Sequence, residues 1–165
     1  NAATTDFNIW NDTAPTSTVF TVNTAHNLNA DGEKYIAYCL TSIQGYSKFG
    51  AYIGNGNTDG PFAYLGFQPA WVMIKRTDST ADWKINDSAR DFNGTYGNDA
   101  SLYANENEAE VTDSSFNVDF LSNGFKLVSA DAGNNASGGT YIYASFAESP
   151  LVTSDDGGSI PATAR

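Results

Sequence analysis

Short apolar runs separated by turn-forming residues extend along almost the whole sequence. The runs are rich in Tyr, Phe, Val and Ile and alternate with Asn-Gly, Asp-Gly and Gly-Gly pairs, a pattern typical of β-strands joined by tight turns. No long window shows a helical period, and the best helical candidate is the acidic segment Glu106–Val111. The predicted strands are Thr18–Val22, Lys34–Ile43, Ser47–Ile53, Phe62–Leu65, Ala70–Arg76, Asp82–Asn86, Phe116–Leu121, Gly124–Ser129 and Thr140–Ala147.

The composition favours the same fold class. The 165 residues include 17 Asn and 16 Thr, and only 16% are charged; Asn and Thr suit turns and strands better than helices. The length corresponds to one domain with a sizeable core. We therefore predict an all-β fold, an antiparallel, jelly-roll-like β-sandwich with long Gly/Asn-rich loops and little helix. Asn123-Gly124 is predicted to form a two-residue hairpin turn, because both of its positions tolerate positive φ.

Charge and cysteine content exclude several classes of protein. The net charge of −11 disfavours binding to nucleic acid or to an anionic membrane surface. No apolar run is long enough to span a bilayer. The single cysteine, Cys39, cannot form an internal disulfide and is predicted to be a buried structural thiol, while the single histidine, His26, is predicted to lie in a loop without a catalytic partner.

One phrase occurs twice, 106 residues apart. Asn29-Ala-Asp-Gly-Glu-Lys-Tyr-Ile and Asn135-Ala-Ser-Gly-Gly-Thr-Tyr-Ile share Asn, Ala, Gly, Tyr and Ile in register. Each phrase opens a nearly continuous apolar run, Tyr35–Leu40 and Tyr141–Phe146, which is typical of a central strand covered on both faces. We expect equivalent hairpins in which Tyr35 and Tyr141 have the same backbone and the same burial; the alternative is that two hairpins of one domain converged on similar turns.

The repeat sets the predicted domain organisation. Residues 1–151 are interpreted as β-sandwich, with 1–44 as the end of one repeat and 45–151 as the next, within a longer tandem array. Residues 152–165 are predicted to form an extended C-terminal tail.

Several longer segments resemble a known family. They run from Gly45 to Phe62, from Gly66 to Arg76, over Phe120-Leu-Ser-Asn-Gly-Phe-Lys-Leu, and from Asn135 to Pro150. Together they resemble a tandem-repeat domain of structural proteins of tailed bacteriophages, common in phages of marine and other aquatic bacteria. The resemblance implies a place on the virion surface, in a tail fibre or a related projection, and it brings no catalytic residues with it.

The residues themselves suggest two candidate ligand sites. Asn55, Asn57 and Asp59 place side-chain oxygens at alternate positions before a glycine, as a calcium loop does, but the position of the bidentate glutamate is Gly66; a hairpin turn is preferred and no metal is predicted. Trp83, Asp87 and Arg90 combine an aromatic face with groups that bond sugar hydroxyls. The alternative for them is a core Trp83 beside an ordinary ion pair. Trp71 is expected to be buried.

These observations lead to one expectation about function, with alternatives. No nucleophile motif or His–Cys pair is present, so the chain is predicted to be a non-enzymatic module without cofactors. It would present loops for host attachment on the virion surface, as a homo-oligomer (a trimer in a tail fibre) among other virion proteins. The alternatives are a carbohydrate-binding receptor-recognition module, a capsid decoration or surface-filament subunit, and, last, a polysaccharide-degrading enzyme.

Overall fold

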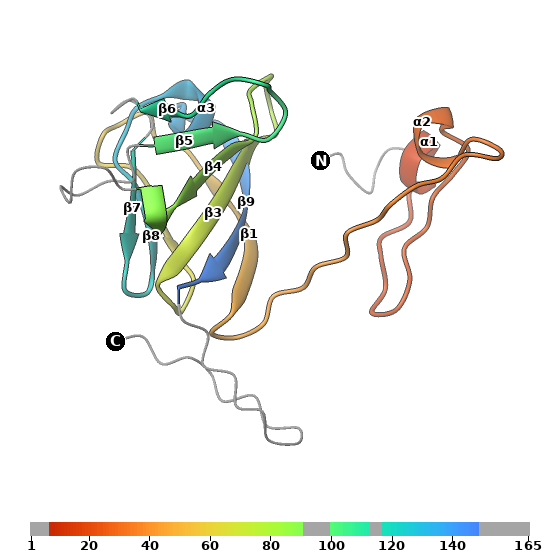
Figure 1. Ribbon diagram of the computed structural model, residues 1–165, viewed down its shortest axis with the longest axis horizontal. Helices are drawn as coiled ribbons and strands as arrows, with labels where there is room; N and C mark the ends of the chain where they lie inside the picture. The colour runs from red at the N-terminus through yellow and green to blue at the C-terminus, as the bar shows by residue number, and fades with distance from the viewer. Residues whose placement is uncertain (1–6, 91–99, 113–116, 149–165) are drawn as a thin grey trace, which may run out of the picture. The chain divides into compact units, whose positions relative to one another are not determined.

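The computed structural model describes residues 7–90, 100–112 and 117–148. The chain divides into two compact units, residues 1–40 and 41–165 (Figure 1). The first unit holds two short helices, α1 (Phe7–Trp10) and α2 (His26–Asn29). The second holds the strands β1 (Ser47–Ile53), β2 (Phe62–Tyr64), β3 (Pro69–Arg76), β4 (Lys84–Asp87), β5 (Ala100–Tyr103), β6 (Val111–Thr112), β7 (Val118–Leu121), β8 (Gly124–Leu127) and β9 (Thr140–Ala147), with a 3-10 turn η2 (Ser88–Arg90) and helix α3 (Ala132–Asn135).

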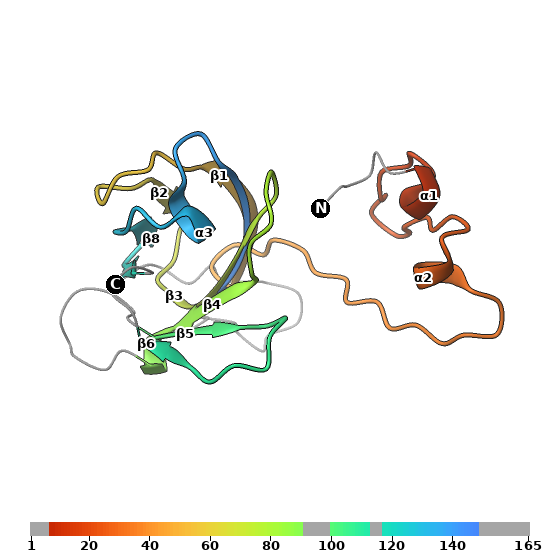
Figure 2. The same cartoon turned by 90° about the horizontal axis from the view of Figure 1, so that it is seen from above.

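The second unit is an antiparallel β-sandwich, as predicted. Six strands form one sheet in the order β1-β9-β3-β4-β5-β6, and three form the other in the order β2-β8-β7. Strand β9, the last in sequence, lies between β1 and β3 and pairs with both along its length. Figure 2 shows β2 and β8 facing the curved sheet that contains β1, β3 and β4.

The core lies between the two sheets. The large sheet contributes Val72 and Ile74 from β3, and Tyr141 and Tyr143 from β9; the small sheet contributes Phe125 from β8 among others. The Phe125 ring packs edge-on against Tyr143, with ring centroids 5.2 Å apart. Alternation of side chains along each strand places these residues on the inner face; the other core residues are Ala63, Leu65, Phe67, Val118 and Leu127.

Most predicted strands exist close to their predicted bounds. Ser47–Ile53 and Thr140–Ala147 are observed exactly as strands. Strands β5 and β6 were not predicted, because they are short and their residues alternate weakly. The predicted helix over Glu106–Val111 is wrong: the segment is irregular and ends in β6.

The prediction that a central strand follows the first copy of the repeated phrase is wrong. Residues 34–42 are extended but form no strand, and Thr18–Val22 forms none either. Tyr35 is 47% exposed, whereas Tyr141 is fully buried. Cys39 is exposed and is not a buried thiol. The reason is that an apolar strand is buried only when flanking strands cover it, and no described residue pairs with residues 34–40.

The β7–β8 hairpin differs in detail from its prediction. Its two-residue loop is Ser122-Asn123, with Leu121 paired to Gly124, and neither Asn123 nor Gly124 has positive φ. Gly124 is needed for space instead. A Cβ atom there would lie 2.2 Å from the Ala63 carbonyl oxygen, so a larger residue would push β2 and β8 apart.

Candidate functional site

The outward side of the six-stranded sheet is built largely from apolar side chains. Phe146 of β9 lies opposite Trp71 of β3, and Ala144 lies between Phe49 of β1 and Met73 of β3. Ala144 is buried, and the other four side chains are half-buried. We call this surface the outer apolar face; the strand registers extend it through Ala51, Ile53, Ile142, Ile85 and Leu102.

Aromatic rings form the centre of the outer apolar face. Tyr46 and Phe49 pack edge-on against Phe146, with centroids 5.8 and 6.0 Å away, and Trp71 lies 5.6 Å from Phe146 on the other side. Trp71 is therefore half-buried on the outside of the sheet, and the expectation that it is buried is wrong. Its neighbour Val72 points inward and is fully buried.

Asp87 and Arg90 are brought together at the edge of this face, beside Trp71 in the β3–β4 register. Asp87 Oδ2 accepts a hydrogen bond from Arg90 Nε at 2.6 Å, and Glu110 Oε2 accepts one from Arg90 Nη1 at 2.6 Å. The hydrogen bond to Glu110 makes the largest contribution to the raised pKa of Arg90, and the one to Asp87 makes the next largest. Arg90 thus pairs with two carboxylates, and the cluster keeps a net charge of −1. Sequence reasoning missed Glu110, which joins the pair only through folding.

Trp83 does not join this cluster. It is half-buried and precedes β4, so it lies about 13 Å along the strand from Asp87. Its backbone N–H donates to Asn105 Oδ1 at 2.8 Å. The predicted sugar site of Trp83, Asp87 and Arg90 is thus not assembled as one constellation.

The loop after β1 uses its side-chain oxygens internally. Asn55 Oδ1 accepts from the Asn57 N–H at 3.0 Å, and Asn57 Oδ1 accepts from the Asp59 N–H at 2.9 Å. Asp59 Oδ1 accepts from Lys126 Nζ, and this hydrogen bond lowers the pKa of Asp59. These hydrogen bonds form consecutive Asx turns. The ammonium group of Lys126, at the end of the series, would repel a cation at the same oxygens.

Asn135 holds this loop to the rest of the sandwich. The side chain is fully buried, and its Nδ2 donates to Ser129 O at 2.7 Å and to Asn57 O at 2.8 Å. Its Oδ1 accepts from the Asn55 N–H at 2.8 Å. One amide therefore joins three segments of the chain. The repeated phrase predicted only a turn at Asn135 and gave no sign of this role.

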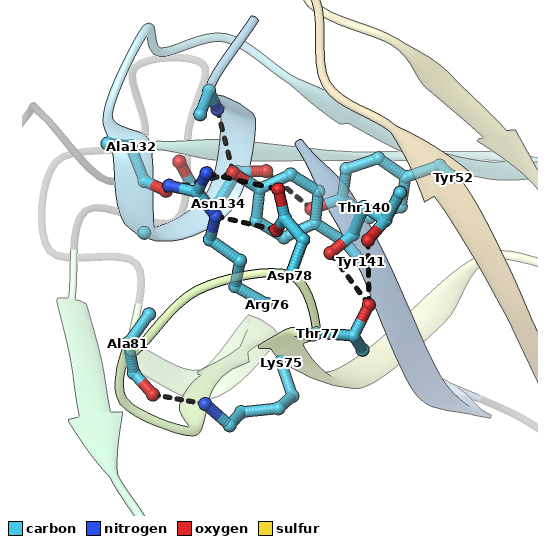
Figure 3. A network of polar contacts seen from close by, with 12 residues as sticks. Tyr52, Lys75, Arg76, Thr77, Asp78, Ala81, Ala132, Asn134, Thr140 and Tyr141 are labelled. Carbon is cyan, nitrogen blue, oxygen red and sulfur yellow. Dashed lines mark hydrogen bonds and ion pairs between the residues drawn. The ribbon is translucent and has the colours of Figure 1, made fainter. Parts of the chain in front are cut away.

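A second polar network joins β3, α3 and β9 (Figure 3). Arg76 forms a bidentate ion pair with Asp78, at 2.8 and 3.2 Å, and its Nη1 donates to Ala132 O at 3.0 Å. The guanidinium lies 6.0 Å from the ring centroid of Tyr141. The hydrogen bond from Arg76 is the largest cause that lowers the pKa of Asp78, to about 2.

The tyrosines of this network are structural. Tyr52 and Tyr141 stack with centroids 5.0 Å apart, and Tyr52 Oη donates to Asn134 O at 2.6 Å. Burial raises the pKa of both phenols, and the contact with Tyr141 adds to the rise at Tyr52. Both phenols stay protonated near neutral pH and fasten α3 to the sheets through their hydrogen bonds.

The outer side of the three-stranded sheet carries exposed aromatic rings. Phe62 and Tyr64 of β2 are 45% and 64% exposed, and Leu121 of β7 is 38% exposed. Tyr64 and Leu121 both pair with Gly124, so a shallow apolar strip crosses this sheet. Lys126, opposite Phe62, borders the strip.

The described residues contain no group of three metal-ligating side chains. None of the described helices is long and apolar enough to cross a membrane. The prediction that His26 lies in a loop is wrong, because His26 is the first residue of α2. It is exposed, and its carbonyl accepts from Tyr35 Oη at 3.0 Å.

Comparison with known proteins gives one match. A family model described as a domain of unknown function, DUF7483, matches residues 1–150. No curated protein and no solved structure matches the chain.

Proposed function

The chain belongs to the DUF7483 family, and we propose that it is a non-enzymatic structural module of a phage virion surface protein, specifically a tail fibre. The proposal takes its biological setting from the phage resemblance of four sequence segments. The observation that supports a structural role is the outer apolar face, because a large apolar surface on a folded domain marks a contact with another protein.

A second copy of the chain is the proposed occupant of this face. A fibre presents the same domain many times, and identical chains usually do so with closed symmetry. The net charge of −11 opposes association, so contacts should be apolar at the centre and charged at the rim. The outer apolar face fits this requirement: its aromatic centre carries no charge, and Asp87 lies at its edge, neutralised by Arg90.

The loops are proposed to face the host. Hydrogen bonds from Asn135 and within residues 55–59 fix the loop after β1, and a fixed loop loses little entropy on binding a receptor. The polar groups of the site candidates bond mainly to one another, which favours a scaffold over an enzyme.

Analysis of purified particles tests the proposal. Mass spectrometry should find the parent protein in washed virions of the encoding phage, and gold-labelled antibodies against the chain should mark a projection. The isolated chain should also slow adsorption of the phage to its host, whereas the heat-denatured chain should not. A parent protein present in infected cells but missing from purified particles would refute the proposal.

Carbohydrate binding is a second candidate, favoured by the exposed rings of Phe62 and Tyr64. Exposed aromatic rings can stack on the apolar faces of sugars, and the strip lies apart from the outer apolar face. A glycan array should then give a signal that Tyr64→Ala abolishes and Trp83→Ala retains, with both variants folded. Binding that Trp83→Ala abolishes and Tyr64→Ala retains would support the sugar site predicted from the sequence instead of the strip. An array without any signal would rule out carbohydrate binding as the second candidate.

A further inference from the structure

The two copies of the repeated phrase have the same local fold. Helices α2 and α3 are each four residues long, and their first residues, His26 and Ala132, are 106 positions apart. The residue after each helix is extended, with φ −73° and ψ 143° at Ala30, and φ −60° and ψ 145° at Ala136. Gly32 and its counterpart Gly138 have φ of 77° and 73°.

The tyrosine that follows each turn makes the same two hydrogen bonds. Tyr35 Oη accepts from the Ala30 N–H at 2.9 Å and donates to His26 O at 3.0 Å. Tyr141 Oη accepts from the Ala136 N–H at 2.7 Å and donates to Ala132 O at 2.8 Å. Every partner is displaced by the same 106 residues, so residues 26–35 and 132–141 are one substructure occurring twice.

The segments that follow the two tyrosines have different surroundings. After Tyr141 the chain forms β9 between β1 and β3. After Tyr35 it is extended without strand partners among the described residues, and Ile36, Tyr38 and Leu40 are 81%, 85% and 64% exposed. An extended apolar segment with unpaired backbone groups is a strand without its sheet.

We propose that residues 34–40 are the β9 strand of a preceding copy of this sandwich. The segment inserts between the β1 and β3 equivalents of a sheet homologous to residues 41–131, so that one repeat ends at Leu40 and the next begins. The inference rests on the two equivalent turns and is independent of where the protein acts.

The geometry of β9 assigns the faces of the inserted strand. Tyr141, Tyr143 and Ser145 point inward, and Ser145 is fully buried with a hydroxyl that has no hydrogen-bond partner among the described residues. The residue equivalent to Ser145 is Cys39, and a thiol is better suited than a hydroxyl to an apolar site without partners. In the completed sheet Cys39 is therefore buried.

The opposite face also matches. Ile36, Tyr38 and Leu40 correspond to Ile142, Ala144 and Phe146 of the outer apolar face, so the preceding repeat has an apolar outer face as well. A large and a small residue also change places between the copies: Ala37 stands for Tyr143, and Tyr38 for Ala144. Tyr143 lies over Gly50, where an added Cβ would be 2.5 Å from its Oη. The preceding sheet is therefore expected to have a larger residue than glycine at that position.

Thiol labelling of the only cysteine tests the proposal. In an extended chain, a copy of residues 41–131, which contains no cysteine, replaces residues 1–25. Residues 26–40 then follow this copy directly, as residues 132–146 follow residue 131 in the original chain. Cys39 should react with a maleimide at least about 100-fold more slowly in the extended chain than in the original chain, because reaction then requires opening of the sheet. A control in which residues 34–38 are reversed in order should react as fast as the original chain.

A second variant guards against a packing mismatch. Ala37→Tyr with Tyr38→Ala restores the sequence of β9 at these positions and should strengthen the protection. Fast labelling of Cys39 in both extended chains would overturn the proposal. Slow labelling in the original chain, together with a dimer in solution, would overturn the tandem assignment and point to strand exchange between separate chains.

Discussion

Replacing Asn135 by alanine should destabilise the sandwich more than any substitution in the exposed loops. The fully buried amide bonds to Ser129 O, Asn57 O and the Asn55 N–H. Alanine cannot replace these bonds. Leaving the buried Ser129 carbonyl unpaired costs about 1–3 kcal/mol, and the Asn57 carbonyl and the Asn55 N–H cost less because both residues are exposed. The free energy of unfolding should therefore fall by about 2–4 kcal/mol.

The chain supplies a matched control. Asn29 occupies the equivalent position of the first copy but is exposed, and its Nδ2 donates to Asn23 O at 3.0 Å. Asn29→Ala should therefore change the free energy of unfolding by less than about 0.5 kcal/mol.

Urea unfolding followed by tryptophan fluorescence measures both variants. With a urea m-value of about 1–3 kcal/mol/M, the midpoint for Asn135→Ala should fall by about 1–4 M at an unchanged slope. If Asn135→Ala and Asn29→Ala unfold at the same urea concentration as the unmodified chain, the buried amide does not hold the loops together and the reasoning is wrong.

Three further predictions follow from single contacts. Gly124→Ala should lower the free energy of unfolding by about 1–3 kcal/mol, measured by thermal melting, because its Cβ would clash with the carbonyl of β2. Tyr141→Phe should cost about 1–3 kcal/mol in urea unfolding through two lost buried hydrogen bonds, while Tyr35→Phe, at a half-exposed ring, should cost less. Asp78 has a folded-state pKa lowered to about 2, so its stabilising contribution is complete above about pH 4 and is lost as the pH falls through about 2; Asp78→Asn should flatten the melting temperature over that range.

The sandwich could be predicted because its strands carry their own local signals. Ser47–Ile53 and Thr140–Ala147 combine β-branched and aromatic residues with glycine-rich flanks, and both are strands as predicted. The same reasoning failed for Lys34–Ile43, although its pattern resembles that of β9. Local pattern specifies that a segment can be a strand, but burial depends on neighbouring strands that are distant in sequence.

The site candidates show a similar limit. Asp87 and Arg90 are close in sequence and do form an ion pair, whereas Trp83 precedes β4 and lies at the opposite end of that strand from Asp87. Glu110 reaches Arg90 only because β4, β5 and β6 are adjacent. The outer apolar face could not be predicted from the sequence either. A strand that has apolar residues on both faces does not show in its sequence which face lies inward.

The most direct test of the structural proposal is the arrangement of this domain in the assembled particle. A reconstruction of the intact virion should show several copies around a symmetry axis, three in a tail fibre, with Trp71 and Phe146 of each copy covered by another copy. A domain that occurs singly, with these two rings open to solvent and no interface larger than about 1,000 Å², would contradict the account.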